Sequence, residues 1–315
     1  MPRKNVTEQL SAKDEGLARA AEILADGGLV AVPTETVYGL AARADSAEAV
    51  ARIYDAKGRP SFNPLIVHVK SIEQAEALAY FDESARGLAA RYWPGPLTLV
   101  LPMRERAGLA AAVSAGLPTI ALRHPGHPVM SALLDRLDFP LAAPSANRSE
   151  GVSPTKPEHV MASLGVSCPA VILGGPTQAG LESTIVALRK EGEWSLLRPG
   201  PITKETLEQT LGPESPKSAV KIEAPGQLAR HYSPGKPVRL EATEVAPDEF
   251  WIGFGPLDGD CNLSESGDLN LAAAQLYENL HRAAASSKPR IAVAPIPESG
   301  VGRAINDRLR RAATQ

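Results

Sequence analysis

Side chains suited to phosphate and carboxylate chemistry lie in several short polar islands, each next to an apolar run. The islands are residues 33–40 (PTETVYGL), 57–60 (KGRP), 119–125 (TIALRHP), 144–148 (PSANR), 182–186 (ESTIV) and 197–200 (LRPG). The sequence contains no GxSxG, HExxH or Walker P-loop motif. Its chemistry is therefore expected to rest on positioned Lys, Arg, Ser, Thr and Asn side chains, without a nucleophile–base pair.

Lys57 and Arg59 are two residues apart, between Gly58 and Pro60, at the end of an expected helix. Their cationic groups are suited to phosphate oxygens, and the glycine and proline fix the backbone beside them. Basic residues at the C-terminal end of a helix also interact favourably with its dipole, so the pattern alone is consistent with both roles. Because neither cation belongs to an apolar face, we expect replacement of either by alanine to leave the protein folded.

Other islands place small polar groups or an arginine after a strand. Thr34 and Thr36 follow a buried strand, where α/β folds bind ligands, although a capped turn has the same composition. Arg123 ends an alternating strand, and could pair with the carboxylate of a small substrate or simply close the strand at the surface. Ser145 and Asn147 could offer a hydroxyl and an amide to one ligand, or cap a turn.

Apolar spacing predicts the elements that position these islands. Helices are expected over residues 14–26, 46–56 (with Ser46 as N-cap), 73–78, 83–92, 127–134, 157–164 and 204–211. Strands are expected over residues 29–32, 65–69, 97–101, 119–122, 141–143, 170–173, 184–188 and 195–197. This alternation predicts the α/β fold class, with a twisted and partly antiparallel sheet.

The composition changes after residue 211. Residues 212–237 are rich in Pro, Gly, Ser and Lys, which is typical of a linker. Beyond them, strands are expected over 249–255 and 290–294 and helices over 270–285 and 301–312. The sequence therefore predicts a catalytic α/β domain at 13–211, a linker at 212–237 and a small Rossmann-like α/β domain at 238–315.

The bulk composition bears on several classes of protein. Of the 315 residues 43% are hydrophobic and 22% charged, and the net charge is −3. This balance predicts a globular protein with little direct nucleic-acid binding, because a basic surface for phosphates is lacking. No apolar run approaches the roughly 18 residues of a membrane span, and the N-terminus lacks an apolar signal segment. Cys168 and Cys261 have no metal-ligand spacing, so we expect a reduced, cytoplasmic protein without a membrane partner.

An ordered set of motifs connects the islands to a known family. The segments PTETVYGL, KGRPSFNPLIVHV, RYWPGPLTLVL, PSANRSEGVSPT, ESTIV, LRPGPI and APGQLARHYSP follow one another along the chain. They resemble the YrdC-type threonylcarbamoyl-AMP synthases over about residues 16–237, and VAPIPESGVGRAINDRLRRAA resembles the C-terminal extension domain of their long form. The resemblance implies a YrdC-like fold, in which a twisted, largely antiparallel sheet and helices surround a concave cleft.

The resemblance also implies an activity. The substrates would be L-threonine, bicarbonate or CO2, and ATP with Mg2+, and the products threonylcarbamoyl-AMP and pyrophosphate. No protein side chain is identified as a metal ligand. Downstream transferase proteins would use the product to modify an adenosine of tRNA next to the anticodon. Such a displacement at phosphorus needs positioning and charge stabilisation more than covalent catalysis, which agrees with the residue types of the islands.

The family's site residues carry over to matching positions of this sequence. The catalytic set would be Lys57, Arg59, Ser145 and Asn147. ATP contacts would fall on Arg59, Asn63, Thr119, Ser145, Ser153, Arg198 and Tyr232. Threonine contacts would fall on Thr34 or Thr36, His68, Arg123, Ser183 and the backbone of Ala143. Two departures are Ala143, where relatives often carry Thr or Ser, and GQLARHYSP, where a Met-containing variant is expected.

Tyr232 is an unusual residue for a solvated linker, because it would expose a large ring. We therefore expect the linker to fold over the cleft, with Tyr232 on the nucleotide; a ring that merely rests on the surface is the alternative. Truncation of this ring is then expected to weaken ATP use without lowering the melting temperature.

Two rival functions are a non-enzymatic RNA-binding protein and an enzyme that transfers a plain carbamoyl group. The negative net charge and the absence of interleaved aromatic residues disfavour the first. The second class is expected to carry Cys-rich domains, whereas this sequence has two cysteines.

Overall fold

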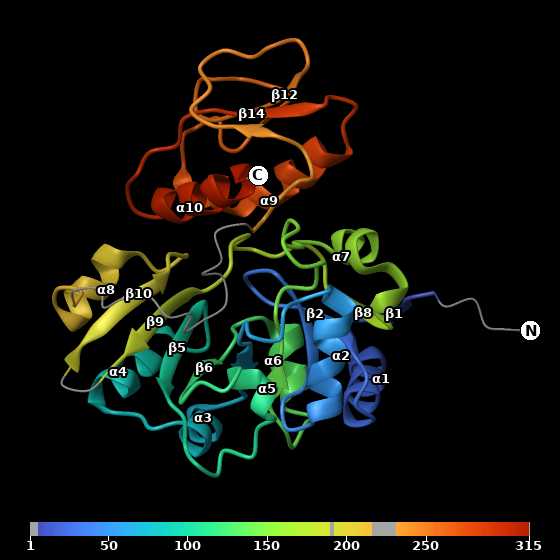
Figure 1. Ribbon diagram of the computed structural model, residues 1–315, viewed down its shortest axis with the longest axis vertical. Coiled ribbons are helices and arrows are strands. Elements are labelled where there is room, and N and C mark those ends of the chain that lie inside the picture. The colour runs from blue at the N-terminus through green and yellow to red at the C-terminus, as the bar shows by residue number, and fades with distance from the viewer. Residues whose placement is uncertain (1–5, 190–191, 216–230, 315) are drawn as a thin grey trace, which may run out of the picture.

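The structure is a computed structural model that describes residues 6–189, 192–215 and 231–314. A ten-stranded sheet forms the larger part of the molecule (Figure 1). Its strands, in spatial order, are β1 (Glu8–Ser11), β8 (Ala170–Leu173), β2 (Val30–Pro33), β3 (Tyr38–Arg43), β7 (Leu141–Ala142), β4 (Ile66–His68), β6 (Thr119–Arg123), β5 (Leu97–Pro102), β9 (Thr184–Leu188) and β10 (Trp194–Arg198). Five neighbouring pairs are antiparallel and four are parallel, so the expected largely antiparallel α/β sheet is confirmed.

Eight helices accompany this sheet in the described residues. They are α1 (Asp14–Ala25), α2 (Ala47–Lys57), α3 (Ile72–Leu78), α4 (Glu83–Tyr92), α5 (Ala111–Ser114), α6 (Pro128–Leu134), α7 (Pro157–Leu164) and α8 (Lys204–Leu211). Helix α2 begins as predicted, with the Ser46 hydroxyl accepting a hydrogen bond from the Ala49 amide. It ends at Gly58, whose left-handed conformation (φ 59°, ψ 39°) favours glycine.

The sequence analysis did not predict β1, β3 or α5. Strand β1 is a short edge strand whose residues EQLS have only one buried member, so it lacks an apolar signal. Strand β3 is almost wholly buried, but its residues YGLAAR read as the continuation of the polar turn before it. Its antiparallel pairing with β2, from Val30–Ala41 to Pro33–Tyr38, makes that turn a hairpin connection.

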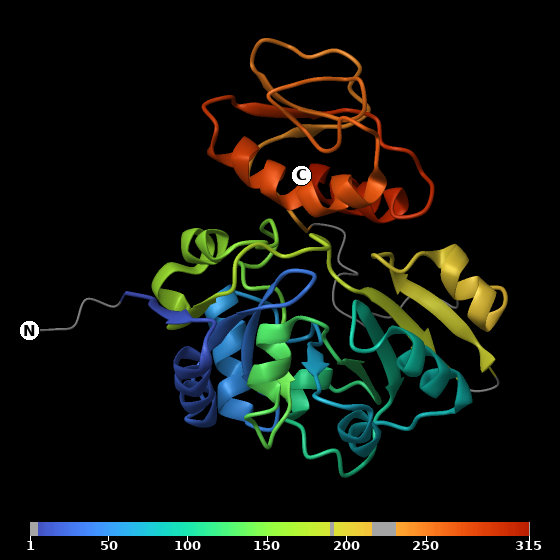
Figure 2. The same ribbon diagram turned by 180° about the vertical axis from the view of Figure 1, so that it is seen from behind.

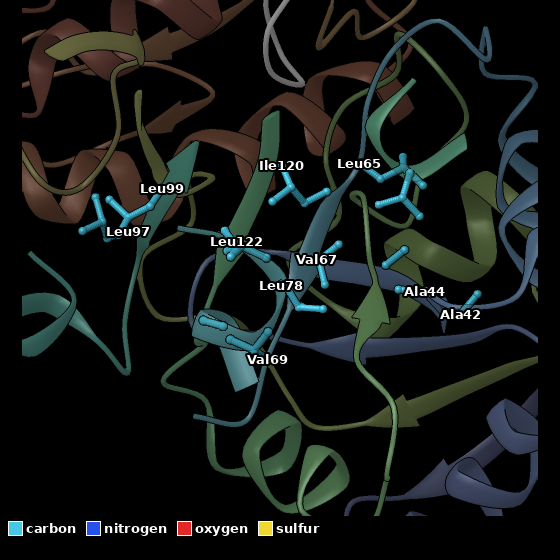
Figure 3. Close-up of a cluster of buried hydrophobic side chains, with 14 of the residues drawn as sticks. Ala42, Ala44, Leu65, Val67, Val69, Leu78, Leu97, Leu99, Ile120 and Leu122 are labelled. Carbon is cyan, nitrogen blue, oxygen red and sulfur yellow. The ribbon is translucent and has the colours of Figure 1, made fainter. Parts of the chain in front are cut away.

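Alternation along the strands divides the sheet into two faces. Leu65, Val67 and Val69 of β4 and its flanks point into the main core, together with side chains from β5 and β6 such as Leu97, Leu99, Ile120 and Leu122 (Figure 3). The intervening residues Ile66 and His68 therefore point to the opposite face. Part of that opposite face is covered by α1 and α6, whose Leu24 and Leu133 belong to a second apolar cluster.

A four-stranded parallel sheet forms the C-terminal part. It consists of β11 (Val238–Arg239), β14 (Arg290–Val293), β12 (Glu249–Gly253) and β13 (Cys261–Asn262), of which β11 and β13 were not predicted because each spans two residues. Helices α9 (Leu269–Ala285) and α10 (Gly302–Ala313) lie between this sheet and the larger part (Figures 1 and 2). The proposed domain boundaries stay a prediction, and residues 216–230 of the expected linker lie outside the described part of the chain. No helix among the described residues is long and apolar enough to cross a membrane.

Candidate active site

A cavity opens on the sheet face opposite the main core. Every polar island contributes to its lining: Thr34, Thr36, Val37, Gly39, Arg59, Ile66, His68, Arg123, Ala143, Pro144, Ser145, Glu182, Arg198, His231 and Tyr232. Its empty space is about 540 Å³, including the part that is open to solvent. Residues far apart in sequence thus form one polar site.

The Arg123 guanidinium is held at the cavity by neighbouring side chains. Its side chain is 4% exposed, and one guanidinium nitrogen lies 2.7 Å from a carboxylate oxygen of Glu35. The other terminal nitrogen donates to the Thr36 hydroxyl at 2.9 Å, which in turn lies 2.8 Å from the Thr34 hydroxyl. Burial alone would raise the pKa of Glu35, but the charge and hydrogen bond of Arg123 lower it below its ordinary value. Glu35 therefore orients the guanidinium as a charged pair.

His68 lies beside this pair at the end of β4, where its neighbour in the parallel register is Arg123. Burial, reinforced by the positive charge of Arg123, lowers the pKa of His68 to about 3. The ring is neutral at physiological pH, and its Nδ1 has no hydrogen-bond partner among the residues that the structure describes. Gly39 forms the neighbouring wall, where a β-carbon would come within 3.2 Å of the Cβ of Ala143. Any larger residue at position 39 would crowd this wall.

Arg59 and Arg198 supply two further buried guanidinium groups. Arg59 donates to the Pro64 carbonyl at 3.1 Å, while its buried Nε has no partner among the described residues. Burial lowers the pKa of Arg59 to about 10, which leaves it charged at neutral pH. Arg198 donates to the main-chain oxygen of Ser183 at 3.0 Å and to its hydroxyl at 3.1 Å. A buried cation with an unpaired donor is suited to an anionic ligand.

Lys57 does not line the cavity. Its side chain is buried, and its ammonium donates to the Ser145 carbonyl at 2.5 Å and to the Asn147 carbonyl. Gly58 turns the chain between Lys57 and Arg59, so the two cations point to different surroundings. The buried Lys57 ties helix α2 to the loop that carries Ser145, which argues against the expectation that Lys57→Ala leaves the protein folded; that expectation stays a prediction.

The remaining predicted residues do not line the cavity. Asn147 donates through its amide to the carbonyls of Arg148 and Gly151 within its own loop. The Ser183 hydroxyl contacts Thr98 at 2.7 Å and the Ser153 hydroxyl donates to Glu182 at 2.5 Å. Asn63, which is buried, and Thr119, which begins β6 at the end opposite Arg123, do not line the cavity either.

Tyr232 lies in the cavity wall, and it also forms part of the contact between the larger part of the molecule and the C-terminal part. Its side chain is 1% exposed and stacks on Tyr277 of α9, with ring centroids 5.6 Å apart. Its φ of 64° is a left-handed conformation that costs a non-glycine residue roughly 1–3 kcal/mol. Because the ring is a fully buried contact, the structure argues against the expectation that its truncation leaves the melting temperature unchanged.

Sequence reasoning missed Glu182 and His231 as cavity residues. Glu182 is 6% exposed in the structure. The available signal in the sequence was an acidic residue directly before two hydroxyl residues, at the start of the ESTIV motif. Although burial opposes it, the guanidinium groups of Arg308 and Arg198 lower the pKa of Glu182 to about 2. For His231 only the adjacent tyrosine gave a signal; burial lowers the pKa of His231 to about 3.

Comparisons with known proteins identify the family of this chain. Residues 22–200 match the Sua5_yciO_yrdC family model, described as telomere recombination, and residues 202–314 match the threonylcarbamoyl-AMP synthase C-terminal domain. The threonylcarbamoyl-AMP synthase of Bacillus subtilis is 40% identical, over 98% of this chain and 96% of its own length. That of Pyrococcus abyssi is 38% identical over 93% of each chain.

A solved structure extends the comparison to three dimensions. The crystal structure of P. abyssi Sua5 complexed with L-threonine superposes with a TM-score of 0.87 at 35% identity, covering 98% of this chain and 97% of that one. Both parts of the molecule are therefore shared with the relatives. The chain belongs to the threonylcarbamoyl-AMP synthase family, in the long form that carries the C-terminal domain.

Proposed function

We propose that the protein joins L-threonine, bicarbonate or CO2, and ATP into threonylcarbamoyl-adenylate with release of pyrophosphate. One observation carries this proposal: a single buried cavity combines the paired Arg123 with the guanidinium groups of Arg59 and Arg198. An amino acid carboxylate and a triphosphate are the two anions that such a site would bring together.

The Arg123 end of the cavity suits threonine. The guanidinium, oriented by Glu35, would donate its remaining N–H groups to the substrate carboxylate, and the hydroxyls of Thr34 and Thr36 lie beside it. The unpartnered Nδ1 of His68 is available to a polar group of the substrate. The relative from P. abyssi binds L-threonine in its crystal structure, which supports the same ligand here.

The Arg59 and Arg198 end suits ATP. The predicted nucleotide contacts Ser145 and Tyr232 line the same cavity, and Asn63, Ser153 and Thr119 would complete the set from behind it or along β6. Mg2+ would enter with the triphosphate as part of the substrate. Glu182, the carboxylate of the cavity lining, and Glu35, which lies behind Arg123, are each paired with an arginine, so neither is free to bind the ion directly.

The reaction then follows from positioning. The amine of threonine adds to CO2 and loses a proton, which gives a carbamate. A carbamate oxygen attacks the α-phosphorus of ATP, and pyrophosphate leaves. Arg59 and Arg198 would stabilise the charge that develops on the phosphoryl oxygens. Lys57 and Asn147 would serve this step by holding the loop that carries Ser145.

Release of pyrophosphate tests this function. Release should require ATP, bicarbonate and L-threonine together, and serine should support it more weakly. The missing methyl group should cost about 1–3 kcal/mol, as for one small apolar contact. Equal release without any amino acid would refute the proposed reaction.

The product would be consumed by downstream proteins that transfer the threonylcarbamoyl group to a tRNA adenosine next to the anticodon. The net charge of −3 favours delivery of the product to those proteins over tight tRNA binding by this chain. Both cysteines are free and buried, which fits a reducing compartment, and we propose that the protein acts in the cytoplasm.

A further inference from the structure

The C-terminal helix α10 contributes a fully buried guanidinium to the wall behind the cavity. Arg308 is 0% exposed, and its Nε donates to a Glu182 carboxylate oxygen at 3.0 Å. The hydroxyl of Tyr277 on α9 donates to the same oxygen at 2.8 Å. The guanidinium also lies over the ring of Tyr232, 5.4 Å from its centroid. Burial of an arginine is costly, so these contacts indicate a specific role.

Glu182 lies between two arginines from different parts of the molecule. It lines the cavity and immediately precedes Ser183, whose carbonyl and hydroxyl oxygens accept hydrogen bonds from Arg198. Among the described residues, the ion pair of Glu182 is made with Arg308 and not with Arg198. The carboxylate therefore pairs with groups of the C-terminal helices and not with the cation that faces the cavity.

We propose that Arg308 is a positioning residue for nucleotide binding: it engages Glu182 so that the positive charge of Arg198 stays available to the triphosphate of ATP. This inference rests on the proposed function for the identity of the anion. Through Arg308 of α10, the C-terminal part would then set the charge at the cavity of the larger part. Without Arg308, the Glu182 carboxylate would turn to the neighbouring Arg198 and neutralise it.

Steady-state kinetics of pyrophosphate release test the proposal with the full chain. In Arg308→Met, the KM for ATP should rise roughly tenfold to hundredfold, the effect of losing one charged hydrogen bond. The KM for threonine should change less than about twofold, because Arg123 is paired with Glu35 and not with Glu182. Arg308→Lys, which keeps the charge, should restore most of the affinity for ATP.

The decisive variant is the double substitution Glu182→Gln with Arg308→Met. It removes the carboxylate that would neutralise Arg198, so its KM for ATP should return to within a few-fold of the wild-type value. A role of Arg308 in packing alone predicts the opposite, since the double variant loses more buried contacts than the single one. A double variant as poor in ATP use as Arg308→Met, or poorer, would overturn the proposal.

Arg303→Ala is the matched control. Arg303 lies on the same helix and pairs with Glu205 of α8 across the two parts, but both side chains are about half exposed. This substitution should leave both KM values unchanged; a rise like that of Arg308→Met would show that any loosened contact suffices, and would refute the specific role. Calorimetric binding of ATP to each variant, with melting temperatures recorded alongside, tests Arg308 even if the wild type forms no threonylcarbamoyl-adenylate. Unaltered ATP affinity in a folded Arg308→Met protein would also refute it.

Discussion

Replacement of Lys57 by methionine should destabilise the protein. The aliphatic part of the side chain is kept, but the ammonium that donates to the Ser145 and Asn147 carbonyls is lost. Lys57 is 3% exposed, so water cannot readily replace this donor. The sequence pattern, by contrast, places Lys57 on phosphate and predicts a folded, slow enzyme.

The expected loss of stability follows from the two carbonyl groups that would lose their hydrogen-bond donor. A buried carbonyl left without a donor costs about 1–3 kcal/mol. The Asn147 carbonyl is buried and the Ser145 carbonyl partly buried, at the lower end of that range, so together they should lower the free energy of unfolding by roughly 2–4 kcal/mol. Since a whole domain is stable by about 5–15 kcal/mol, such a loss is easily measured. Turnover should also fall, because Ser145 lines the cavity on the loop that Lys57 fixes.

Urea unfolding, followed by tryptophan fluorescence and far-UV circular dichroism, measures this loss. Trp93 and Trp194 are 7% and 1% exposed and report on the larger part of the molecule. Lys70→Met is a graded control, because Lys70 donates to one partly buried carbonyl, that of Leu137 at 2.9 Å, and should cost less than about 1.5 kcal/mol. If Lys57→Met unfolded within about 1 kcal/mol of the wild type and yet lost its activity, the structural role would be wrong and a phosphate contact favoured.

Three further outcomes are expected. Arg123→Met should raise the KM for threonine at least 100-fold, because the substrate carboxylate would lose its charged hydrogen-bond donor. Adding Glu35→Gln should recover stability in urea, because it removes the unpaired buried carboxylate, without recovering the KM. Between pH 7 and pH 5, His68 and His231 should each lower the free energy of unfolding by about 2 kcal/mol. The reason is that the unfolded imidazoles bind protons near pH 6.5, whereas the folded ones have pKa values of about 3. In His68→Gln, unfolding measured at both pH values should show a decrease smaller by about 2 kcal/mol than in the wild type. Tyr232→Ala should lower the free energy of unfolding by about 3–5 kcal/mol, as for other buried rings, besides weakening ATP binding; an unchanged melting temperature would contradict its burial.

Much of the fold could be predicted from local sequence signals. Helix α2 has an N-cap at Ser46 and a left-handed glycine at its end, and these signals act within a few residues. Strand β4 alternates between core and cavity side chains, which follows from the period of two. Strands β11 and β13 gave no such signal, because two residues are too few for a periodicity and their pairing depends on β14 and β12.

The sequence by itself determined the residue types of the site and the order of the islands that supply them. Only the tertiary structure decided which of these residues face the cavity. Arg59 and Lys57 are equally basic in the sequence, but Gly58 turns one toward the cavity and leaves the other buried against two carbonyls. The task of Arg308 likewise depends on Glu182, 126 positions earlier in the chain. The physical reason is that local preferences fix turns and helices, whereas the surroundings of a charge depend on the distant groups that folding brings against it.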